Sequence, residues 1–371
     1  MTARRILVLG TIPDRSEAAL LERLARAGRD VHAVFQPRAQ RLDALRTAGV
    51  GISFAELRWE SRRTDAATVS SLVRERAPDV IHVLRSKSLR LLRQACSPPW
   101  PPTVFYRGTI ESPRWWSWSD RRKFFDPNIV RYLAVSEAVR RALLDGGVPP
   151  ARIAVLRKGH DPSWYQVPAI DFRAELGLRR TTFLLGVVAN IRWEKGVEFA
   201  VAAAHRLADA GRDVHLALLG DDERHGLRRR LRPLSAPGRV THVGPRSDVA
   251  AILPSFDVLL LPSLREGSPR AVAEAMMRSV PVVASNVGGV PELLDGGRVG
   301  RLVEAADVAG MARAIAELMD DDAERRRIGA LGRAHVEELL SLERVTQQAL
   351  AIYDEVASAS REAKSSVMTW R

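Results

Sequence analysis

Two glutamates, Glu266 and Glu274, stand eight positions apart in the stretch Pro262–Met277, which reads PSLREGSPRAVAEAMM. An apolar run at Val258–Leu261 comes just before it and predicts a buried parallel strand. Such a strand leads into a loop that holds Glu266, and then into a helix whose second turn holds Glu274. Carboxylates accept charge-assisted hydrogen bonds from hydroxyl groups, and open α/β sheets bind ligands beyond the carboxyl ends of their strands. The stretch therefore predicts a site for a molecule with several hydroxyl groups.

The helix start in this stretch suits an anion. Ser268 stands where a helix N-cap belongs, and Pro269 stands at the first helical position. Because the bare amides at a helix N-terminus attract phosphate groups, we expect Gly267, Ser268 and Pro269 to contact one. A phosphate beside two carboxylates is a site for a phosphorylated sugar. The alternative is a pair of surface acids on an ordinary helix, since glutamates at this spacing are common by chance.

Two other segments have a similar strand–loop–helix pattern. An apolar strand is predicted at Thr182–Ala189, and residues 190–196 after it read NIRWEKG. Residues 287–292 read VGGVPE, a glycine loop with proline at the start of the next helix. These segments are similar to the Gly-Arg-Leu-x-x-x-Lys-Gly and Gly-Gly-x-Pro-Glu patterns of retaining glycosyltransferases of family 4, with Asn190 in place of the first glycine. With the Glu-x7-Glu spacing they make the chain resemble that family, whose members have the two-domain GT-B fold.

The resemblance implies that a sugar moves from a nucleotide diphosphate sugar, with UDP or GDP, to an acceptor hydroxyl with retention at the sugar. Negative charge builds up on the departing diphosphate, and fixed cations stabilise it. Arg192 and Lys195 would supply those cations. Glu266 would hold hydroxyls of the sugar, and Glu274 would hold the ribose.

The resemblance also implies that the segment HVGPRSD, with Gly244 and Arg246, packs against the nucleobase. It implies no cofactor and no obligatory metal. The acidic run Asp320–Asp322 has the look of a metal site, but it precedes a predicted helix. Acids at a helix N-terminus favoured by the helix dipole are the better explanation, so no metal ligands are predicted.

The length of 371 residues favours two domains. Strands and helices alternate along the chain, which predicts doubly wound parallel sheets, the α/β class, in each domain. We expect an N-terminal Rossmann-like acceptor-binding domain at 1–165 and a C-terminal Rossmann-like donor-binding domain at 170–340. A helix at about 342–358 is expected to pack back on the first domain.

Charge is distributed unevenly between the two halves. Residues 1–165 hold 29 Lys and Arg against 16 Asp and Glu, whereas residues 166–371 hold 28 of each, so the first half carries the whole net charge of +13. Such asymmetry points to an anionic partner for that half. The single cysteine, Cys96, excludes an internal disulfide and favours a reducing cytoplasm.

The segment Ser112–Phe125 packs three Trp, two Phe and four basic residues into fourteen positions. Tryptophan beside arginine and lysine is typical of an interfacial membrane anchor. The alternative is a loop folded over the acceptor cleft with its aromatic side chains partly buried. Base stacking is disfavoured because no nucleic-acid fold signature accompanies the segment, and no nucleic-acid partner is expected. The candidate membrane contacts are Trp115, Trp116, Trp118, Arg121, Arg122 and Lys123.

The first half departs from the family in three places. Gly10 and Thr11 stand where many members have a Gly-Gly loop, and Arg107 stands where many have histidine. Arginine has a fixed charge and cannot act as a base, but it could hold an anionic sugar, an acceptor phosphate or the leaving diphosphate. His160 replaces a more usual valine at the hinge, either as a pH-sensitive group at the cleft or as a hinge residue without a catalytic role.

The leading hypothesis is a retaining, metal-independent glycosyltransferase of cell-surface polysaccharide, lipopolysaccharide or glycolipid synthesis. Its acceptor would be a glycan, a lipid-linked sugar or a small molecule. The protein would be cytoplasmic, with peripheral binding at the inner face of the cell membrane where the Trp-rich segment docks. Two alternatives are a GT-B nucleotide-sugar epimerase and a non-catalytic basic adaptor that binds nucleotide sugar or an anionic surface. Sugar turnover without an acceptor would favour the first, and tight donor binding without product the second.

Overall fold

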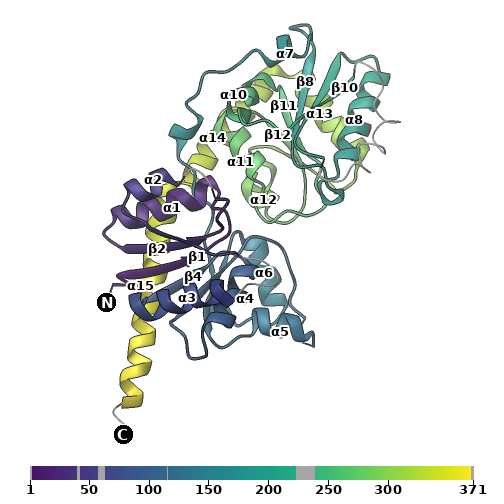
Figure 1. Cartoon of the computed structure of the whole chain (residues 1–371). Helices are drawn as coiled ribbons and strands as arrows, with labels where there is room; N and C mark the ends of the chain where they lie inside the picture. The colour runs from purple at the N-terminus through teal and green to yellow at the C-terminus, as the bar shows by residue number, and fades with distance from the viewer. Residues whose placement is uncertain (1, 40–41, 57–62, 115, 223–238, 369–371) are drawn as a thin grey trace. The chain divides into compact units, whose positions relative to one another are not determined.

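The computed structural model describes residues 2–39, 42–56, 63–114, 116–222 and 239–368. It divides into two compact units (Figure 1). One unit comprises Met1–His160 with Leu340–Arg371, and the other comprises Asp161–Leu339.

The first unit is an open parallel sheet with helices packed on it. Its seven strands lie in the order β3-β2-β1-β4-β5-β6-β7. Along the chain its elements are β1 Arg5–Leu9, α1 Arg15–Arg26, β2 Asp30–Phe35, α2 Asp43–Thr47, β3 Gly51–Phe54, α3 Arg63–Arg76, β4 Val80–Val83, α4 Ser86–Ala95, β5 Thr103–Arg107, α5 Trp118–Phe124, β6 Ile129–Ala134, α6 Glu137–Asp145, η1 Pro150–Arg152, β7 Ile153–Val155 and α15 Leu342–Met368.

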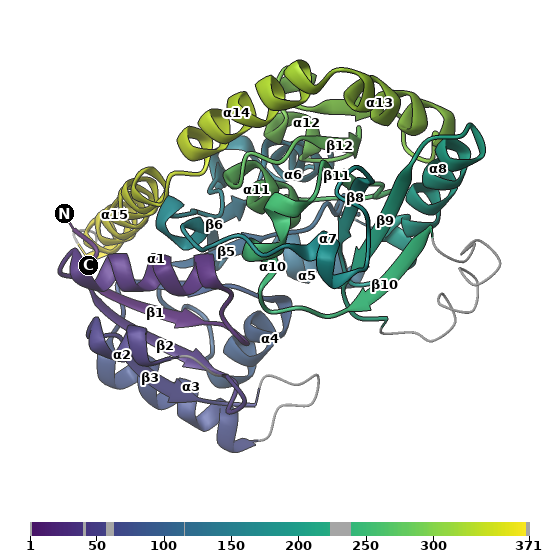
Figure 2. The same cartoon turned by 90° about the horizontal axis from the view of Figure 1, so that it is seen from above.

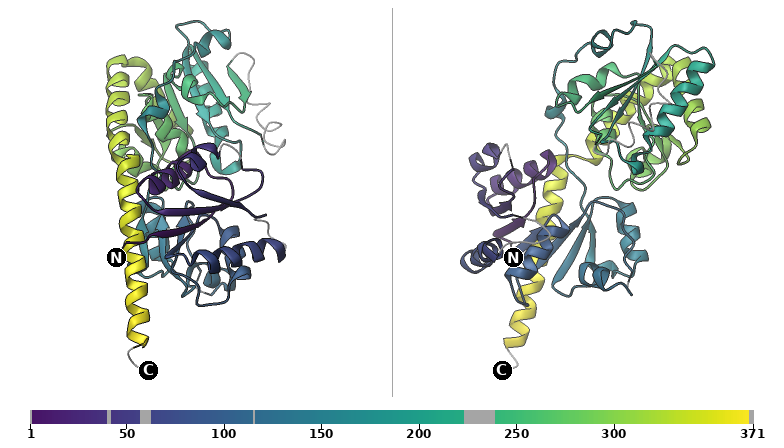
Figure 3. Two further views of the ribbon diagram at one scale, coloured as in Figure 1. Left: turned by 60° about the vertical axis from the view of Figure 1, so that its left-hand side comes forward. Right: turned by 45° about the vertical axis from the view of Figure 1, so that its right-hand side comes forward.

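The central strands β1, β4 and β5 of this unit are short, mainly apolar runs buried on both faces, as is typical of parallel sheets. In β1 every residue after Arg5 is buried. The last helix, α15, packs against α1 and β4, and its apolar side chains join the same core. Figure 3 shows α15 running beside the strands of this unit. The C-terminal helix thus completes the first unit, although about 180 residues of the second unit precede it in the chain.

The second unit is a parallel sheet of six strands in the order β10-β9-β8-β11-β12-β13. Helices α8 and α13 lie side by side against it, as Figure 2 shows. Along the chain its elements are η2 Pro162–Tyr165, α7 Phe172–Glu175, β8 Phe183–Val188, η3 Trp193–Lys195, α8 Val197–Asp209, β9 Val214–Leu219, β10 Val240–Gly244, α10 Val249–Ile252, η5 Leu253–Ser255, β11 Val258–Leu261, α11 Arg270–Met277, β12 Val282–Ser285, α12 Val290–Leu293, η6 Asp295–Gly297, β13 Arg301–Val303, α13 Val308–Asp320 and α14 Asp322–Leu339.

Strand order reverses once in each sheet. In the second unit the chain runs outward from β8 through β9 to β10, and then restarts at β11 on the other side of β8. In the first unit the same reversal falls between β1 and β4. Loops that leave neighbouring strands at such a point diverge and leave a crevice for ligand. The predicted fold class, doubly wound parallel sheets, is confirmed.

Candidate functional site

The loops that leave β8 and β11 carry the central pair of charged residues. Lys195 Nζ donates a hydrogen bond to Glu266 Oε1 at 2.8 Å, and Ser263 Oγ donates to the same oxygen at 2.7 Å. The Glu266 side chain is buried, whereas that of Lys195 is 28% exposed. A buried carboxylate is stable when it is paired and hydrogen-bonded. The structure thus brings together, at the switch point of the sheet, two residues that stand 71 positions apart.

Backbone contacts hold these loops in place. The amide of Leu264 donates to the carbonyl of Glu194 at 2.8 Å, and the amide of Gly289 donates to the carbonyl of Glu266 at 3.1 Å. Gly196 has a φ of +56°, and a Cβ built there would lie 2.2 Å from the carbonyl oxygen of Pro262. Only glycine can adopt this conformation and approach so closely without strain. The three loops after β8, β11 and β12 therefore form one connected assembly around Glu266.

Helix α11 begins later than the sequence predicts. Pro269 is its N-cap, with a ψ of 110°, and its first helical residue is Arg270. The prediction that Ser268 caps the helix is wrong, because Ser268 lies one residue before the N-cap. Pro269 provides no side-chain cap, which leaves the helix start suited to an anion. Gly267 and Ser268, both half-buried, lie in the loop that leads to it.

The other predicted donor-side residues lie along the same edge of the sheet. Glu274, in the second turn of α11, has a carboxylate 3.4 Å from the Arg270 guanidinium. Arg192 is exposed at the start of η3. Gly244 ends β10, and its carbonyl accepts a hydrogen bond from the Gly220 amide at 2.9 Å.

Arg246 is engaged by two carboxylates. Its Nε donates to Asp248 Oδ1 at 2.8 Å, and its Nη1 donates to Glu175. The hydrogen bonds to Asp248 and Glu175 raise the pKa of the guanidinium above its ordinary value. Its side chain is thus tied within the protein, and the neighbouring Gly244 presents backbone only.

In the first unit, Gly10 and Thr11 follow β1 at the switch point. The Gly10 amide donates to the carbonyl of Val34 at 3.0 Å, and a Cβ at Gly10 would lie 2.9 Å from Leu84 Cδ1. His160 is buried, with its amide donating to Leu340 O at 2.7 Å and its carbonyl accepting from Leu342 N at 3.0 Å. Those bonds join the segment after β7 to the start of α15.

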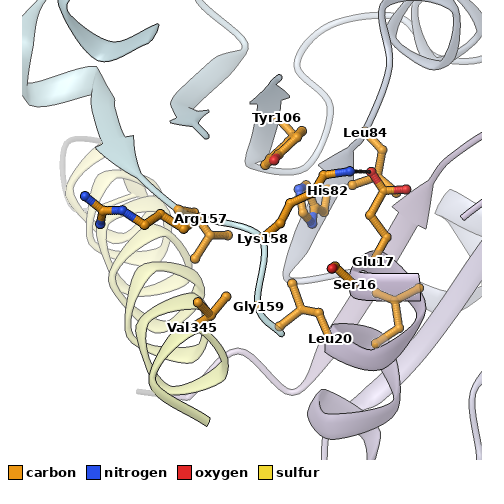
Figure 4. Close-up of a pocket in the computed structure, with 12 residues that line it drawn as sticks. Ser16, Glu17, Leu20, His82, Leu84, Tyr106, Arg157, Lys158, Gly159 and Val345 are labelled. Atoms are coloured by element: carbon orange, nitrogen blue, oxygen red, sulfur yellow. Dashed lines mark hydrogen bonds and ion pairs between the residues drawn. The ribbon is translucent and has the colours of Figure 1, made fainter. Parts of the chain in front are cut away.

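A cluster of four charged side chains at this edge was missed by sequence reasoning. Asp14 and Glu17 form a capping box at the start of α1. Glu17 Oε1 also accepts from Arg85 Nη2 at 2.7 Å and from Lys158 Nζ at 3.2 Å, and Lys158 donates to Asp14 as well. Figure 4 shows Lys158 reaching toward Glu17. The Asp-x-x-Glu spacing signals the cap, but nothing in the sequence signals its cations.

Beside this cluster lies a small pocket with mostly apolar walls from α1, β4, β5, the segment after β7 and α15 (Figure 4). His82 and Tyr106 line it, and within the described part of the chain His82 Nε2 and Tyr106 Oη have no hydrogen-bond partner. Burial lowers the pKa of His82 to about 3, with Arg85 acting in the same direction. The cavity, about 20 Å³, has room for about one water molecule.

Arg107 ends β5 with its side chain buried. Its Nη2 lies 2.9 Å from Glu111 Oε2, and its guanidinium carbon lies 5.0 Å from the centre of the Phe105 ring and 4.9 Å from that of Phe124. The rings and the carboxylate together compensate a charge that burial would otherwise make costly.

The Trp-rich segment is partly helical, because α5 spans half of it with Ser117 as N-cap. Trp116 is 68% exposed and Trp118 is 72% exposed, with the Arg122 guanidinium 4.8 Å from the Trp118 ring centre. Arg121 is exposed too. Lys123 differs, because it turns inward to Glu111. Trp115 lies outside the described residues.

Two kinds of feature are absent from the described residues. None of the helices there is long and apolar enough to cross a membrane. Nor do His, Cys, Asp and Glu gather there in a group of three or more that could hold a metal ion. In the run Asp320–Asp322, Asp321 accepts the Glu324 amide at 2.8 Å and Asp322 begins α14, which agrees with acids at a helix N-terminus.

Family models match both halves of the chain. Residues 15–164 match the model of glycosyltransferase family 4, and residues 182–321 match that of glycosyl transferases group 1. The alpha-maltose-1-phosphate synthase of Mycolicibacterium smegmatis is 31% identical over 300 residues, which cover 75% of this chain and 74% of that protein.

Solved structures share the fold. The Anabaena protein Alr3699/HepE in complex with UDP-glucose superposes with a TM-score of 0.77 at 22% identity, covering 95% of this chain and 99% of that one. WaaG, a glycosyltransferase involved in lipopolysaccharide biosynthesis, gives a TM-score of 0.72 at 14% identity, covering 94% of this chain and 99% of that one. These likenesses extend over both units.

Proposed function

Because the chain belongs to glycosyltransferase family 4, the group 1 glycosyltransferases with the GT-B fold, we propose that it transfers a sugar from a UDP- or GDP-sugar to an acceptor hydroxyl with retention. One observation carries this proposal. A lysine and a buried glutamate meet at 2.8 Å where the strand order of the second sheet reverses. UDP and UDP-glucose are bound by the structural neighbour HepE, which favours UDP as the first nucleotide to test.

Each donor-side residue has a proposed task. Lys195 and Arg192 contact the diphosphate and stabilise the charge that develops as the sugar–phosphate bond breaks. The uncapped start of α11 supports the same group through its amides. Glu266 accepts hydrogen bonds from sugar hydroxyls, and Glu274 from the ribose.

In this proposal the acceptor hydroxyl attacks the anomeric carbon from the face that the diphosphate leaves, and a diphosphate oxygen takes the hydroxyl proton. The transfer needs no metal ion, since lysine, arginine and helix amides supply the positive charge. The nucleobase packs against the backbone at Gly244. Arg246, held by Asp248 and Glu175, fixes that loop.

A donor screen tests the proposal. Purified protein is titrated calorimetrically with UDP, GDP, ADP and TDP, and then assayed for release of nucleotide from the matching sugar donors with and without EDTA. We expect saturable binding of one nucleotide and slow release from its sugar that EDTA leaves unchanged. Binding without any release in the presence of many acceptors would favour an adaptor, and isomerised donor sugar would favour an epimerase.

The acceptor side is proposed to work at a membrane surface, on a lipid-linked or cell-surface glycan. Trp116 and Trp118 are largely exposed, and Arg121 and Arg122 lie on the same short helix as Trp118. Tryptophan side chains favour the membrane interface, and arginines are attracted to anionic lipid headgroups. WaaG, a structural neighbour, is involved in lipopolysaccharide biosynthesis. Lys123 is left out of this surface because it pairs with Glu111.

Vesicle co-sedimentation measures this docking. We expect binding to vesicles that contain phosphatidylserine, weaker binding at high salt because the charges are screened, and little binding to pure phosphatidylcholine. The double variant Trp116→Ala/Trp118→Ala should lose most of the bound fraction. Trp193→Ala is the matched control, since Trp193 is also 59% exposed but lies in the second unit. Binding that ignores lipid charge and salt, or equal loss in both variants, would rule out this surface.

A further inference from the structure

We propose that the first unit holds an anion subsite, built from Arg107 and the start of α4, for a phosphate or carboxylate group of the substrate. The inference rests on the proposed transferase function and adds a substrate class to it. It concerns the carboxyl edge of the first sheet, where β4 leads into α4 and β5 ends at Arg107.

Two cations share one carboxylate at this place. Arg107 Nη2 lies 2.9 Å from Glu111 Oε2, and Lys123 Nζ contacts the same oxygen. Asp120, the other carboxylate that acts on the charge of Lys123, accepts a hydrogen bond from Arg114 at 3.2 Å. The cluster of Arg107, Lys123 and Glu111 therefore has a formal net charge of +1. Burial lowers the pKa of both cations, because each charged group loses hydration there.

The guanidinium of Arg107 has bonding capacity to spare. Its side chain is 5% exposed, and Nε has no hydrogen-bond partner within the described ranges. Arginine presents five N–H donors in a planar fork that matches a carboxylate or phosphate. A buried donor without an acceptor is costly, so an arriving anion would gain a hydrogen bond that the protein itself does not supply.

The start of α4 faces the same guanidinium. Arg107 Nη1 lies 3.4 Å from Ser86 Oγ, and Ser86 is the first residue of this ten-residue helix. The N-cap residue, Arg85, provides no side-chain cap, and the first turn holds no acid. The Arg107 guanidinium, the dipole of α4 and the Ser86 hydroxyl therefore meet at one place, and the first turn of α4 supplies no acid to it.

Glu111 shows what kind of group fits. Burial alone would raise the pKa of its carboxyl, but Arg107 and Lys123 together lower it. Its side chain lies on the loop after β5 and is 39% exposed, and Thr109 Oγ1 donates to its other carboxylate oxygen at 3.0 Å. A substrate phosphate or carboxylate would take its place between the two cations. The sugar hydroxyls of a neutral substrate would not balance these charges.

Calorimetric titration of the full-length protein tests the subsite. UDP is added first to saturation, so that the donor diphosphate site is filled, and inorganic phosphate is then titrated against chloride at constant ionic strength. Arg107→Gln should weaken phosphate binding about tenfold or more, the effect of losing a charge-assisted contact. Glu111→Gln should strengthen it several-fold, because the competing carboxylate is gone. Arg46→Gln, which breaks a surface pair with Asp43, should change nothing.

Arg107→Gln and Glu111→Gln are expected to shift phosphate affinity in opposite directions, and this difference distinguishes a change in anion binding from damage to the structure. Both remove the same Arg107–Glu111 pair, so structural damage alone would shift phosphate affinity in the same direction in both. Such parallel shifts, or wild-type protein that binds no phosphate, would overturn the subsite. The first titration tests the proposed function independently. If UDP does not bind, phosphate is titrated without it, and the opposed shifts still decide the matter.

Two comparisons of binding affinity show whether the anionic group belongs to the donor sugar or to the acceptor. If it belongs to the donor sugar, Arg107→Gln weakens binding of UDP-glucuronate but not of UDP-glucose. If it belongs to the acceptor, the variant leaves both donors unchanged and weakens binding of glucose 1-phosphate relative to glucose. Equal affinities of wild type and Arg107→Gln for all four compounds would contradict the proposal.

Discussion

Lys195→Ala is expected to lower the rate of sugar transfer by about two to three orders of magnitude, the range found when one preorganised donor to a developing negative charge is removed. The loss should fall mainly on kcat. The charge on the diphosphate grows as the bond to the sugar breaks, so the lysine acts most strongly in the transition state. Affinity for the free nucleotide should fall much less.

Steady-state kinetics with the donor identified by the screen measure this effect. Lys195→Arg should recover part of the rate, because it keeps the charge but changes the geometry. Arg239→Ala is the control, since it removes another ion-paired cation of the second unit, 2.6 Å from Asp209. Arg239 stands just before β10, at the amino edge of the sheet, whereas the loops around Glu266 leave its carboxyl edge. If Lys195→Ala keeps a turnover within a factor of about three of wild type, the lysine has no such role.

Much of the fold is predictable because its strands are continuous apolar runs. Val258–Leu261 was predicted as a strand and is β11 with the same bounds. Helix α5 was not predicted, because its tryptophans and arginines obscure the ordinary helical pattern, and its signal is the N-cap Ser117. Helix α2 was missed as well, since five residues give too little periodicity.

The site was predictable to the extent that its residues stand in local patterns. Glu266 and Lys195 each stand beyond a predicted strand, so their meeting follows once both strands are neighbours of the switch point. The cluster around Lys158 was not predictable in this way. Its partners, Asp14 and Glu17, lie 144 and 141 positions away, and they meet Lys158 because the segment after β7 passes beside the start of α1.

Arg107 was predictable from the sequence only in part. Its position after a strand and its charge were visible in the sequence, and the idea of an anionic ligand followed from them. The reason to prefer an anion over a structural ion pair comes from the geometry. Two cations share Glu111, and the start of α4 carries no acid of its own. Glu111 is only four positions from Arg107, but Lys123 and the start of α4 lie 16 and 21 positions away, and only the folded chain brings them to the same place.

Gly196→Ala is expected to destabilise the proposed donor site without removing any functional group. An alanine at a φ of +56° costs about 1 kcal/mol in backbone strain. Its Cβ would also lie 2.2 Å from the carbonyl oxygen of Pro262, so one of the two loops must move. Movement of about 1 Å in a catalytic loop can cost about a hundredfold in rate. We therefore expect a transfer rate reduced roughly ten- to a hundredfold.

Gly211→Ala separates the effect of backbone strain from the effect of the contact between the new Cβ and Pro262. Gly211 also has a positive φ, +81°, and lies in the same unit, but a Cβ there would meet nothing within 4 Å. Its substitution should lower the free energy of unfolding by about 1 kcal/mol and leave the transfer rate unchanged, as measured by urea unfolding and by kinetics on the same preparations. Equal loss of rate in both variants would mean that backbone strain alone is responsible. Full activity of Gly196→Ala would mean that the contact with Pro262 does not position Lys195 against Glu266.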